Sequence, residues 1–324
     1  MKVLILGGTR FVGTIAAQEA VSRGHHVTVF NRGTRPAPAG TAMLTGDRLG
    51  GLDALRTGSW DLVIDTWKGA PRAVRETARL LAGRAGHYTY VSSRSVYAQP
   101  APPGGDESGP LVEGAAPDAG DVPYPQAKLG GEMAVAESFG DRALFARAGL
   151  VLGPYENVGR LPWWLDRVSR GGTIPAPGPA DLPLQFIDAR DLARFLLDHP
   201  ATGGAFDLIG PPGHTTMRGL LEACAAATGT APDLRWLSPE QVEAAGVEPW
   251  SDLPVWLPPG ELHDTMHSGD PAKALARGLV CRPAAETVAG TWAWMRSSGW
   301  SAPDTVFGRK VGLSPEQEKA LLAA

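Results

Sequence analysis

The chain has 324 residues, of which 43% are hydrophobic, and it carries a formal net charge of −4. A chain of this length can bury a substantial core, as one large domain or as two. The acidic balance supplies no general positive field, which disfavours broad binding to nucleic acid or to anionic membranes. No stretch of about twenty apolar residues occurs, and Lys2 leads directly into a predicted strand. We therefore expect a cytoplasmic protein without a membrane span or a leader.

The N-terminal stretch predicts a strand, a glycine-rich turn, a helix and a second strand. A continuous apolar run at 3–6 is typical of a parallel strand covered on both faces. Glycines surround the start of a predicted helix at 11–22, where free N–H groups and the helix dipole favour a diphosphate. A second apolar strand at 27–30 completes a unit typical of nucleotide binding, although a glycine turn can also be purely structural. The predicted dinucleotide contacts in this turn are Gly7, Thr9, Arg10, Phe11, Val12 and Gly13.

The residues after the second strand bear on the choice between NAD and NADP. NAD sites usually place an Asp or Glu there to bind the adenosine ribose, but this chain continues with Asn31 and Arg32. A guanidinium matches the oxygens of a ribose 2′-phosphate, so Arg32, helped by Arg10, predicts NADP, with NAD less favoured. Solvated loop arginines are the alternative. Asp47, after a third predicted strand, could accept the adenine amino group or could serve only in its turn.

Strands and helices continue to alternate along the chain. A strand at 60–66 ends just before Trp67, and a helix at 72–85 leads to an alternating strand that ends in Ser92 and Ser93. In parallel sheets the carboxyl ends of the strands face the ligand. A segment rich in proline, glycine and acid at 99–123 predicts an exposed loop, either a lid or a flexible connection.

A predicted helix from 124 to 138 follows this loop and contains the second group of candidate functional residues. Its first turn holds Tyr124 and Lys128, which share one helix face because residues four apart are neighbours.

Five stretches now occur in a recognisable order: Gly-Gly-Thr-Arg-Phe-Val-Gly at 7–13, Ser-Ser-Arg-Ser-Val-Tyr at 92–97, Tyr-x-x-x-Lys at 124–128, Arg147 through Gly153-Pro154, and Phe-Ile-Asp-Ala-Arg-Asp-Leu-Ala at 186–193. With them the chain resembles the extended short-chain dehydrogenase/reductase family, the NAD-dependent epimerase/dehydratase-like group. The resemblance implies an α/β fold with a Rossmann-type, doubly wound parallel sheet and a smaller C-terminal substrate-binding lobe. It also implies that Ser93, Tyr124 and Lys128 are catalytic, with Ser92 as the second choice for the serine.

The chain departs from the family pattern at two places. Arg10 stands where the family's turn has its middle glycine, which marks an atypical branch and strengthens the prediction of NADP. Sugar-nucleotide enzymes of the family carry an arginine just before the Phe-Ile segment to hold a diphosphate, but Leu184 and Gln185 stand there. A nucleotide-sugar substrate is therefore disfavoured, unless Arg160 or Arg167 replaces that arginine.

The implied chemistry is hydride transfer coupled to proton transfer. A free tyrosine, with a pKa of about 10, is a poor match to neutral pH. We expect Lys128 and an oxidised nicotinamide to lower the pKa of Tyr124, which would act as acid in reduction and as base in oxidation. Ser93 would donate a hydrogen bond to the reacting oxygen, and Tyr124 and Lys128 would also contact the cofactor, Lys128 at its ribose.

For the domains we expect a dinucleotide-binding unit at 1–155, with 186–200 packing back onto it, and a substrate-binding lobe formed by 156–185 and 201–324. The candidate substrate contacts are Trp67, Trp163 and Trp164, although aromatic residues more often build cores.

No metal site is predicted. His263 and His267 lie four apart, but flanking glycines predict a loop and no third ligand is evident. The two cysteines lack zinc-site spacing.

The predicted function is an NADP(H)-dependent oxidoreductase, of a biosynthetic pathway, acting on a small to medium organic carbonyl, alcohol or imine. Dehydration is disfavoured because Arg94 and Ser95 stand where the family's dehydratases carry acids. The alternatives are a nucleotide-sugar epimerase and a non-catalytic NADP-sensing or RNA-binding relative. We expect a small-molecule substrate and neither nucleic acid nor membrane as partner, and the family leaves a homodimer open.

Overall fold

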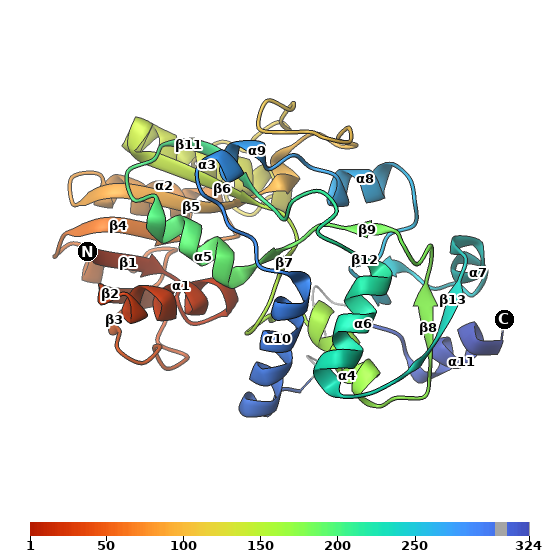
Figure 1. Ribbon diagram of the computed structural model, residues 1–324. Coiled ribbons are helices and arrows are strands. Elements are labelled where there is room, and N and C mark those ends of the chain that lie inside the picture. Colours follow the sequence, from red (N-terminus) through yellow and green to blue (C-terminus); the bar gives the residue numbers. More distant parts are fainter. Residues whose placement is uncertain (302–309, 324) are drawn as a thin grey trace.

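The computed structural model describes residues 1–301 and 310–323 and is built around a seven-stranded parallel sheet (Figure 1). Its strands are β1 (Lys2–Leu6), β2 (His26–Asn31), β3 (Ala42–Thr45), β4 (Trp60–Asp65), β5 (Ala85–Ser93), β6 (Ala143–Ala148) and β11 (Gly204–Leu208). The strand order is β11-β6-β5-β4-β1-β2-β3, so the direction of winding reverses between β1 and β4. This is the doubly wound Rossmann arrangement that the alternating strands and helices predict.

Helices cover both faces of the sheet. On one face lie α1 (Phe11–Ser22) and α5 (Ala189–Asp198), and on the other α2 (Pro71–Leu81) and α3 (Tyr124–Phe139). Val3 and Ile5 join the core under α1 and α5, whereas Leu4 and Leu6 join the core under α2 and α3. Because successive strand residues point to opposite faces, the apolar run in β1 supplies both cores.

The C-terminal lobe has its own core and lies to one side of the sheet (Figure 1). Its larger elements are α4 (Arg160–Ser169), β8 (Thr173–Pro177), α6 (Met217–Thr228), β13 (Asp233–Leu237), α7 (Pro239–Ala244), α8 (Glu261–His267), α10 (Ala284–Ser298) and α11 (Pro315–Ala323). Short elements connect them: β7 (Val151–Leu152), β9 (Pro183–Leu184), β10 (Ile187–Asp188), β12 (Thr215–Thr216), β14 (Pro249–Trp250) and β15 (Leu253–Pro254). Three 3-10 turns, η1 (Asp53–Leu55), η2 (Arg94–Val96) and η3 (Gly140–Arg142), lie in the sheet half.

The lobe core is built largely from tryptophan. Trp164 and Trp256 are fully buried, and six more tryptophans pack against that core, namely Trp163, Trp236, Trp250, Trp292, Trp294 and Trp300. The aromatic side chains of this half therefore serve first as core, which is their more common use.

The expected domain division needs one correction. The expected division places residues 204–208 in the lobe, but they form β11, which pairs in parallel with β6 at the edge of the main sheet. The short helix α9 (Ala272–Ala276) packs on the same strand. The sequence at 205–209 predicts a strand. Which strand it pairs with depends on the path of the chain after α5, which the sequence pattern does not specify. The segment 186–200 does pack back onto the sheet, through α5 against α1.

Candidate active site

The glycine turn joins β1 to α1 through an unusual backbone. Gly7 and Gly8 have φ values of +117° and +79°, and Phe11, at the start of α1, has a φ of +33°. A Cβ atom on Gly13 would lie 2.7 Å from the backbone nitrogen of Gly8, so turn and helix pack backbone to backbone. No side chain caps the first N–H groups of α1. The turn therefore fits a phosphate cradle, which needs close backbone approach and free N–H donors.

The residues predicted to bind the adenosine end lie on loops at the same edge of the sheet. Arg10 and Arg32 are exposed and follow β1 and β2, which are paired in parallel. The Asn31 side chain accepts a hydrogen bond from the Gly33 N–H at 2.7 Å, and its amide nitrogen is buried without a hydrogen-bond partner in the described chain. Asp47 accepts from the Leu49 N–H at 2.9 Å, which is the turn role that its position allows.

The structure brings Ser93, Tyr124 and Lys128 together. Ser93 is the last residue of β5, and the other two lie in the first turns of α3. Tyr124 is 45% exposed, the Ser93 hydroxyl acts to lower its pKa, and the Lys128 Nζ lies 5.9 Å from the centroid of the Tyr124 ring. The Ser93 hydroxyl itself donates to the Ser95 hydroxyl at 3.1 Å. Ser92 points to the opposite face of β5, where it is 3% exposed and its hydroxyl has no partner among described residues. Strand alternation thus favours Ser93 over Ser92.

Two backbone carbonyls accept hydrogen bonds from the Lys128 ammonium. Its ammonium donates to the carbonyls of Trp67 at 2.6 Å and Val91 at 2.7 Å, and lies 4.7 Å from the centroid of the Tyr90 ring. Burial lowers the pKa of Lys128 to about 7, although the charge of Asp65 opposes the shift. The lysine is thus fixed against the sheet.

Burial, Ser93 and Arg160 act on the pKa of Tyr124. Burial raises the pKa of Tyr124 above its ordinary value, and the opposing effects come from the Ser93 hydrogen bond and the charge of Arg160. Lys128, with a pKa of about 7, is neutral at the pH where a phenol ionises. The lowering expected from Lys128 together with an oxidised nicotinamide stays a prediction.

A buried ion pair that sequence reasoning missed supports Trp67. Arg48 binds both carboxylate oxygens of Asp65, at 2.8 and 2.9 Å, and Tyr88 donates to the same carboxylate at 2.6 Å. The Arg48 guanidinium lies 5.2 Å from the centroid of the Trp67 ring, whose backbone carbonyl binds Lys128. The sequence signal for this ion pair is Asp65 at the end of a predicted buried strand, because a buried carboxylate needs a cationic partner.

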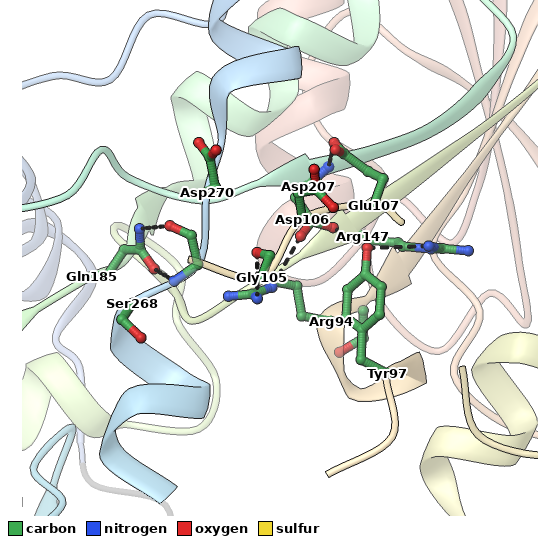
Figure 2. A network of polar contacts seen from close by, with 12 residues as sticks. Arg94, Tyr97, Gly105, Asp106, Glu107, Arg147, Gln185, Asp207, Ser268 and Asp270 are labelled. Carbon is green, nitrogen blue, oxygen red and sulfur yellow. Dashed lines mark hydrogen bonds and ion pairs between the residues drawn. The ribbon is translucent and has the colours of Figure 1, made fainter. Parts of the chain in front are cut away.

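A second buried network of polar contacts is centred on Tyr97 and Asp207 (Figure 2). Tyr97 donates to Asp207 at 2.7 Å and accepts from Arg147 at 3.1 Å, and Arg94 forms an ion pair with Asp207 at 3.1 Å. Burial raises the pKa of Asp207 to about 6, opposed mainly by the Arg94 charge. Arg94, where dehydratases carry an acid, is therefore used to join β5 to β11.

The same network fastens the segment 99–123. Glu107 accepts from the Asp207 N–H at 2.7 Å, and Arg94 donates to the Gly105 carbonyl at 3.3 Å (Figure 2). The Gly104 N–H donates to the Ser268 carbonyl at 2.6 Å, and the Asp270 N–H donates to the Gly105 carbonyl at 3.0 Å. Near 104–107 these contacts bind the segment to both halves of the molecule.

On the lobe side, the prediction for Trp164 is corrected. Its side chain is fully buried, and its indole N–H donates to the Pro254 carbonyl at 2.7 Å, so it belongs to the lobe core and has no exposed surface to offer a substrate. Trp163 is partly buried and packs edge-on against Trp164, with ring centroids 4.7 Å apart. The two neighbours differ because α4 turns one ring inward and the other toward its margin.

The arginines proposed as substitutes for the diphosphate arginine also differ. Arg167 is buried and binds Glu318 and the carbonyls of Gly171 and Thr173, so it has no capacity for a ligand. Arg160 is partly buried, and its guanidinium lies 5.2 Å from the centroid of the Trp250 ring. Gln185 is 1% exposed and bonds Gly210 and Gly269, so the diphosphate position of the family is closed here by structural contacts.

The two histidines lie on a helix, α8, rather than in a loop. His263 interacts with the Pro183 carbonyl at 2.9 Å and His267 with the Val255 carbonyl at 3.0 Å. Burial lowers the pKa of His267 to about 4. Both rings serve in packing, and the described part of the chain contains no group of three or more His, Cys, Asp or Glu residues suited to a metal. Within the same residues, no helix combines the length and apolar character needed to cross a bilayer.

Comparison with known proteins agrees with this architecture. The model of the NAD dependent epimerase/dehydratase family matches residues 3–207. The chloroplast stem-loop binding protein of 41 kDa b of Arabidopsis thaliana is 26% identical over 270 residues, which is 75% of this chain and 67% of that protein.

Solved structures show the same fold. A putative epimerase from Burkholderia cenocepacia J2315 is 19% identical, with 91% of this chain and 98% of that chain covered and a TM-score of 0.67. The UDP-glucose 4-epimerase of Thermus thermophilus, solved in complex with NAD, is 18% identical, with 92% and 100% covered and a TM-score of 0.61.

Proposed function

Because the chain belongs to the NAD-dependent epimerase/dehydratase family, we propose that it is an NADP(H)-dependent oxidoreductase that reduces or oxidises a small to medium organic carbonyl or alcohol. One observation carries the proposal. A serine, a tyrosine and a lysine from β5 and α3 lie together at the edge of the sheet that also holds the glycine turn. That is the combination needed to transfer a proton to an oxygen while a hydride reaches the carbon beside it.

In this mechanism each residue has a separate role, and a bound nicotinamide supplies or accepts the hydride. Tyr124 gives its phenolic proton to the reacting oxygen in reduction and takes it back in oxidation. The raised pKa of Tyr124 keeps that proton in place near neutral pH. Ser93 donates a hydrogen bond to the same oxygen, where negative charge develops. Lys128, with two of its three N–H donors on carbonyls, offers the third to a ribose hydroxyl.

The preference for NADP rests on the loops after β1 and β2. Arg10 and Arg32 are exposed at neighbouring strand ends, and no acid occupies the position after β2. Asn31 adds a buried amide nitrogen without a partner in the described chain. A ribose 2′-phosphate would satisfy both guanidinium groups, whereas a ribose hydroxyl pair would not.

Two other functions are supported by specific observations. The fold neighbours include a UDP-glucose 4-epimerase, and epimerisation through a transient ketone would use the same three residues. It ranks second here because Leu184 and Gln185 are buried where a diphosphate arginine would stand. The relative from Arabidopsis is named as a stem-loop binding protein, but the formal charge of −4 supplies no matching field for RNA.

The experiment is to measure oxidation of NADPH and NADH with a panel of aldehydes and ketones. We expect turnover with NADPH, a loss of about 100-fold or more in Ser93→Ala, and much less change in the matched control Ser92→Ala. Conversion of UDP-glucose to its 4-epimer, without net change in nicotinamide absorbance, would instead establish the epimerase. Cofactor binding without either reaction, together with tight binding of a stem-loop RNA, would establish the binding protein.

A further inference from the structure

Arg94 directly follows Ser93 in the chain, yet its side chain has no role in the proposed mechanism. The side chain is 10% exposed and forms an ion pair at 3.1 Å with Asp207, whose carboxylate is fully buried. The same guanidinium donates to the Gly105 carbonyl at 3.3 Å (Figure 2). Desolvation offsets much of the attraction within a buried ion pair, so the local geometry that the pair fixes is more informative than its contribution to stability.

The geometry that Arg94 fixes includes the orientation of the Ser93 hydroxyl. Ser93 is the N-cap of η2, and its side-chain oxygen accepts a hydrogen bond from the Ser95 N–H at 3.2 Å. Its hydroxyl donates to the Ser95 hydroxyl at 3.1 Å. Because Arg94 is the residue between the two serines, its backbone determines whether these contacts form. The N–H bond fixes the Ser93 oxygen while leaving its proton free to rotate toward a substrate.

The other end of η2 is tied to the helix that carries Tyr124. Tyr97, the residue after η2, donates to Asp207 at 2.7 Å and accepts from Arg147 at 3.1 Å. Arg147 in turn binds the Glu132 carboxylate of α3 through two hydrogen bonds, at 2.8 and 3.1 Å. A series of buried polar contacts therefore joins η2 to α3, and it fixes the position of the serine relative to the proposed proton donor.

The lobe reaches this network through the segment 268–270, which follows α8. A Cβ atom on Gly269 would overlap the Arg94 guanidinium, so the guanidinium packs directly on that backbone. Gln185 holds the same glycine, accepting from its N–H at 2.9 Å and donating to its carbonyl at 2.8 Å. The Asp270 N–H donates at 3.0 Å to the Gly105 carbonyl, which also accepts from Arg94 (Figure 2). The lobe and the segment near 105 thus both contact the residue that follows the serine.

We propose that Arg94 is a positioning residue that couples the lobe to Ser93. Contact of the segment 268–270 with the guanidinium holds Arg94 on Asp207, and this keeps η2 in the conformation that orients the serine hydroxyl. The inference rests on the proposed function, since it takes Ser93 as the donor to the reacting oxygen. The consequence is that the serine is set for the reaction by the same contacts that hold the lobe against the sheet.

The first test changes the lobe side of this contact. Gly269 lies outside the left-handed region, so Gly269→Ala is compatible with the backbone, and its methyl group should displace the Arg94 guanidinium. We expect kcat for carbonyl reduction by NADPH to fall by about 10- to 100-fold, because a small misplacement of a hydrogen-bond donor slows the reaction strongly. The dissociation constant of NADPH should change less than about threefold. The matched control is Gly83→Ala, whose methyl group meets no atom within 4 Å and should leave kcat unchanged.

A double-mutant cycle tests whether the effect passes through Ser93. If it does, the variant that combines Ser93→Ala with Gly269→Ala should be no slower than Ser93→Ala alone. Multiplication of the two losses would overturn the proposal. Arg94→Gln, which removes the guanidinium without changing the lobe, should show the same loss of kcat, and Arg94→Lys should restore part of it because it keeps a charge toward Asp207.

A second ion pair controls for a general loss of stability. Arg167 and Glu318 form an ion pair in the lobe, with side chains that are 7% and 20% exposed. Glu318→Gln should lower the urea midpoint of unfolding, as Arg94→Gln should, but it should leave kcat unchanged. An equal loss of kcat in the two variants would show that destabilisation alone explains the result, and the positioning role would be wrong.

Amide hydrogen exchange separates this inference from the proposed function, because it needs no turnover. The Ser95 N–H is bonded to the Ser93 oxygen, and we expect it to exchange at least about tenfold faster in Gly269→Ala than in the wild type. Faster exchange in a protein that turns over no carbonyl would leave the coupling standing and refute the proposed function. Turnover that requires Ser93 but keeps its kcat in Gly269→Ala would refute the coupling and leave the function standing. Unchanged exchange of the Ser95 N–H would refute the coupling whatever the activity.

Discussion

The two sides of the candidate site follow different rules. On the sheet side, Ser93, Tyr124 and Lys128 lie at the end of a parallel strand and the start of the following long helix. On the lobe side, Trp163, Trp164 and Arg160 come from one short helix, yet one ring is core, its neighbour is marginal and the guanidinium is unpaired among the described residues. The contrast shows that backbone topology determines which residues lie at the edge of the sheet. In the lobe, side-chain packing determines which residues are buried and which are exposed.

The largest expected effect tests the sheet side. Tyr124→Phe removes the proton that is transferred but keeps the ring, so kcat should fall by about 10²- to 10⁴-fold. The dissociation constant of NADPH, measured by fluorescence, should change little. A comparable loss of cofactor affinity would show that Tyr124 acts in cofactor binding and would contradict its role as the proton donor.

The next effect tests the lobe side. Trp164→Ala should lower the free energy of unfolding by about 3–5 kcal/mol, because it empties a fully buried site, while Trp163→Ala should cost about 1–2 kcal/mol. Urea denaturation measures both. If Trp163 also contacts the substrate, its replacement should raise KM. Equal losses of stability would show that α4 does not separate a core face from an outer face.

A smaller effect concerns the cofactor loop. Arg32→Ala should weaken NADPH binding by about 10- to 100-fold, because a charge-assisted hydrogen bond to the 2′-phosphate is lost, and should leave NADH binding nearly unchanged. Arg35→Ala, a second exposed arginine of the same loop, is the matched control. An equal change for both cofactors would remove the argument for NADP.

A further effect is a dependence of stability on pH. The pKa of Lys128 is about 7 in the folded chain and 10.5 ordinarily, so between these values the unfolded chain binds the proton more tightly. The free energy of unfolding should therefore rise with pH in that window because of Lys128, by at most about 1.4 kcal/mol per pH unit.

Lys128→Met should remove this slope, which denaturation between about pH 7.5 and 9.5 would measure. A slope that persists in the variant would assign the pH dependence to other groups. The same result would mean that the lysine is charged in both states.

Much of the sheet half could be predicted because its signals are local. The apolar run at 3–6, the glycines before α1 and the hydroxyls that end β5 each constrain the backbone or follow from it. The buried ion pair of Arg48 and Asp65 could not be predicted, because its two residues meet only after β4 is placed beside β1. The helix α8 was missed for a related reason, since its ends are marked by glycine and its rings are fixed by carbonyls of distant segments.

Sequence alone predicted the doubly wound sheet and the glycine turn, and the resemblance to a family implied the roles of Ser93, Tyr124 and Lys128. These follow from hydrophobic period and short motifs, which act through neighbouring residues and through the common direction of parallel strands. Only the tertiary structure decided that Trp164 is core and that the segment around Gly105 is fastened to both halves. Such contacts join residues far apart in the chain, and their energies depend on burial, which no local pattern specifies.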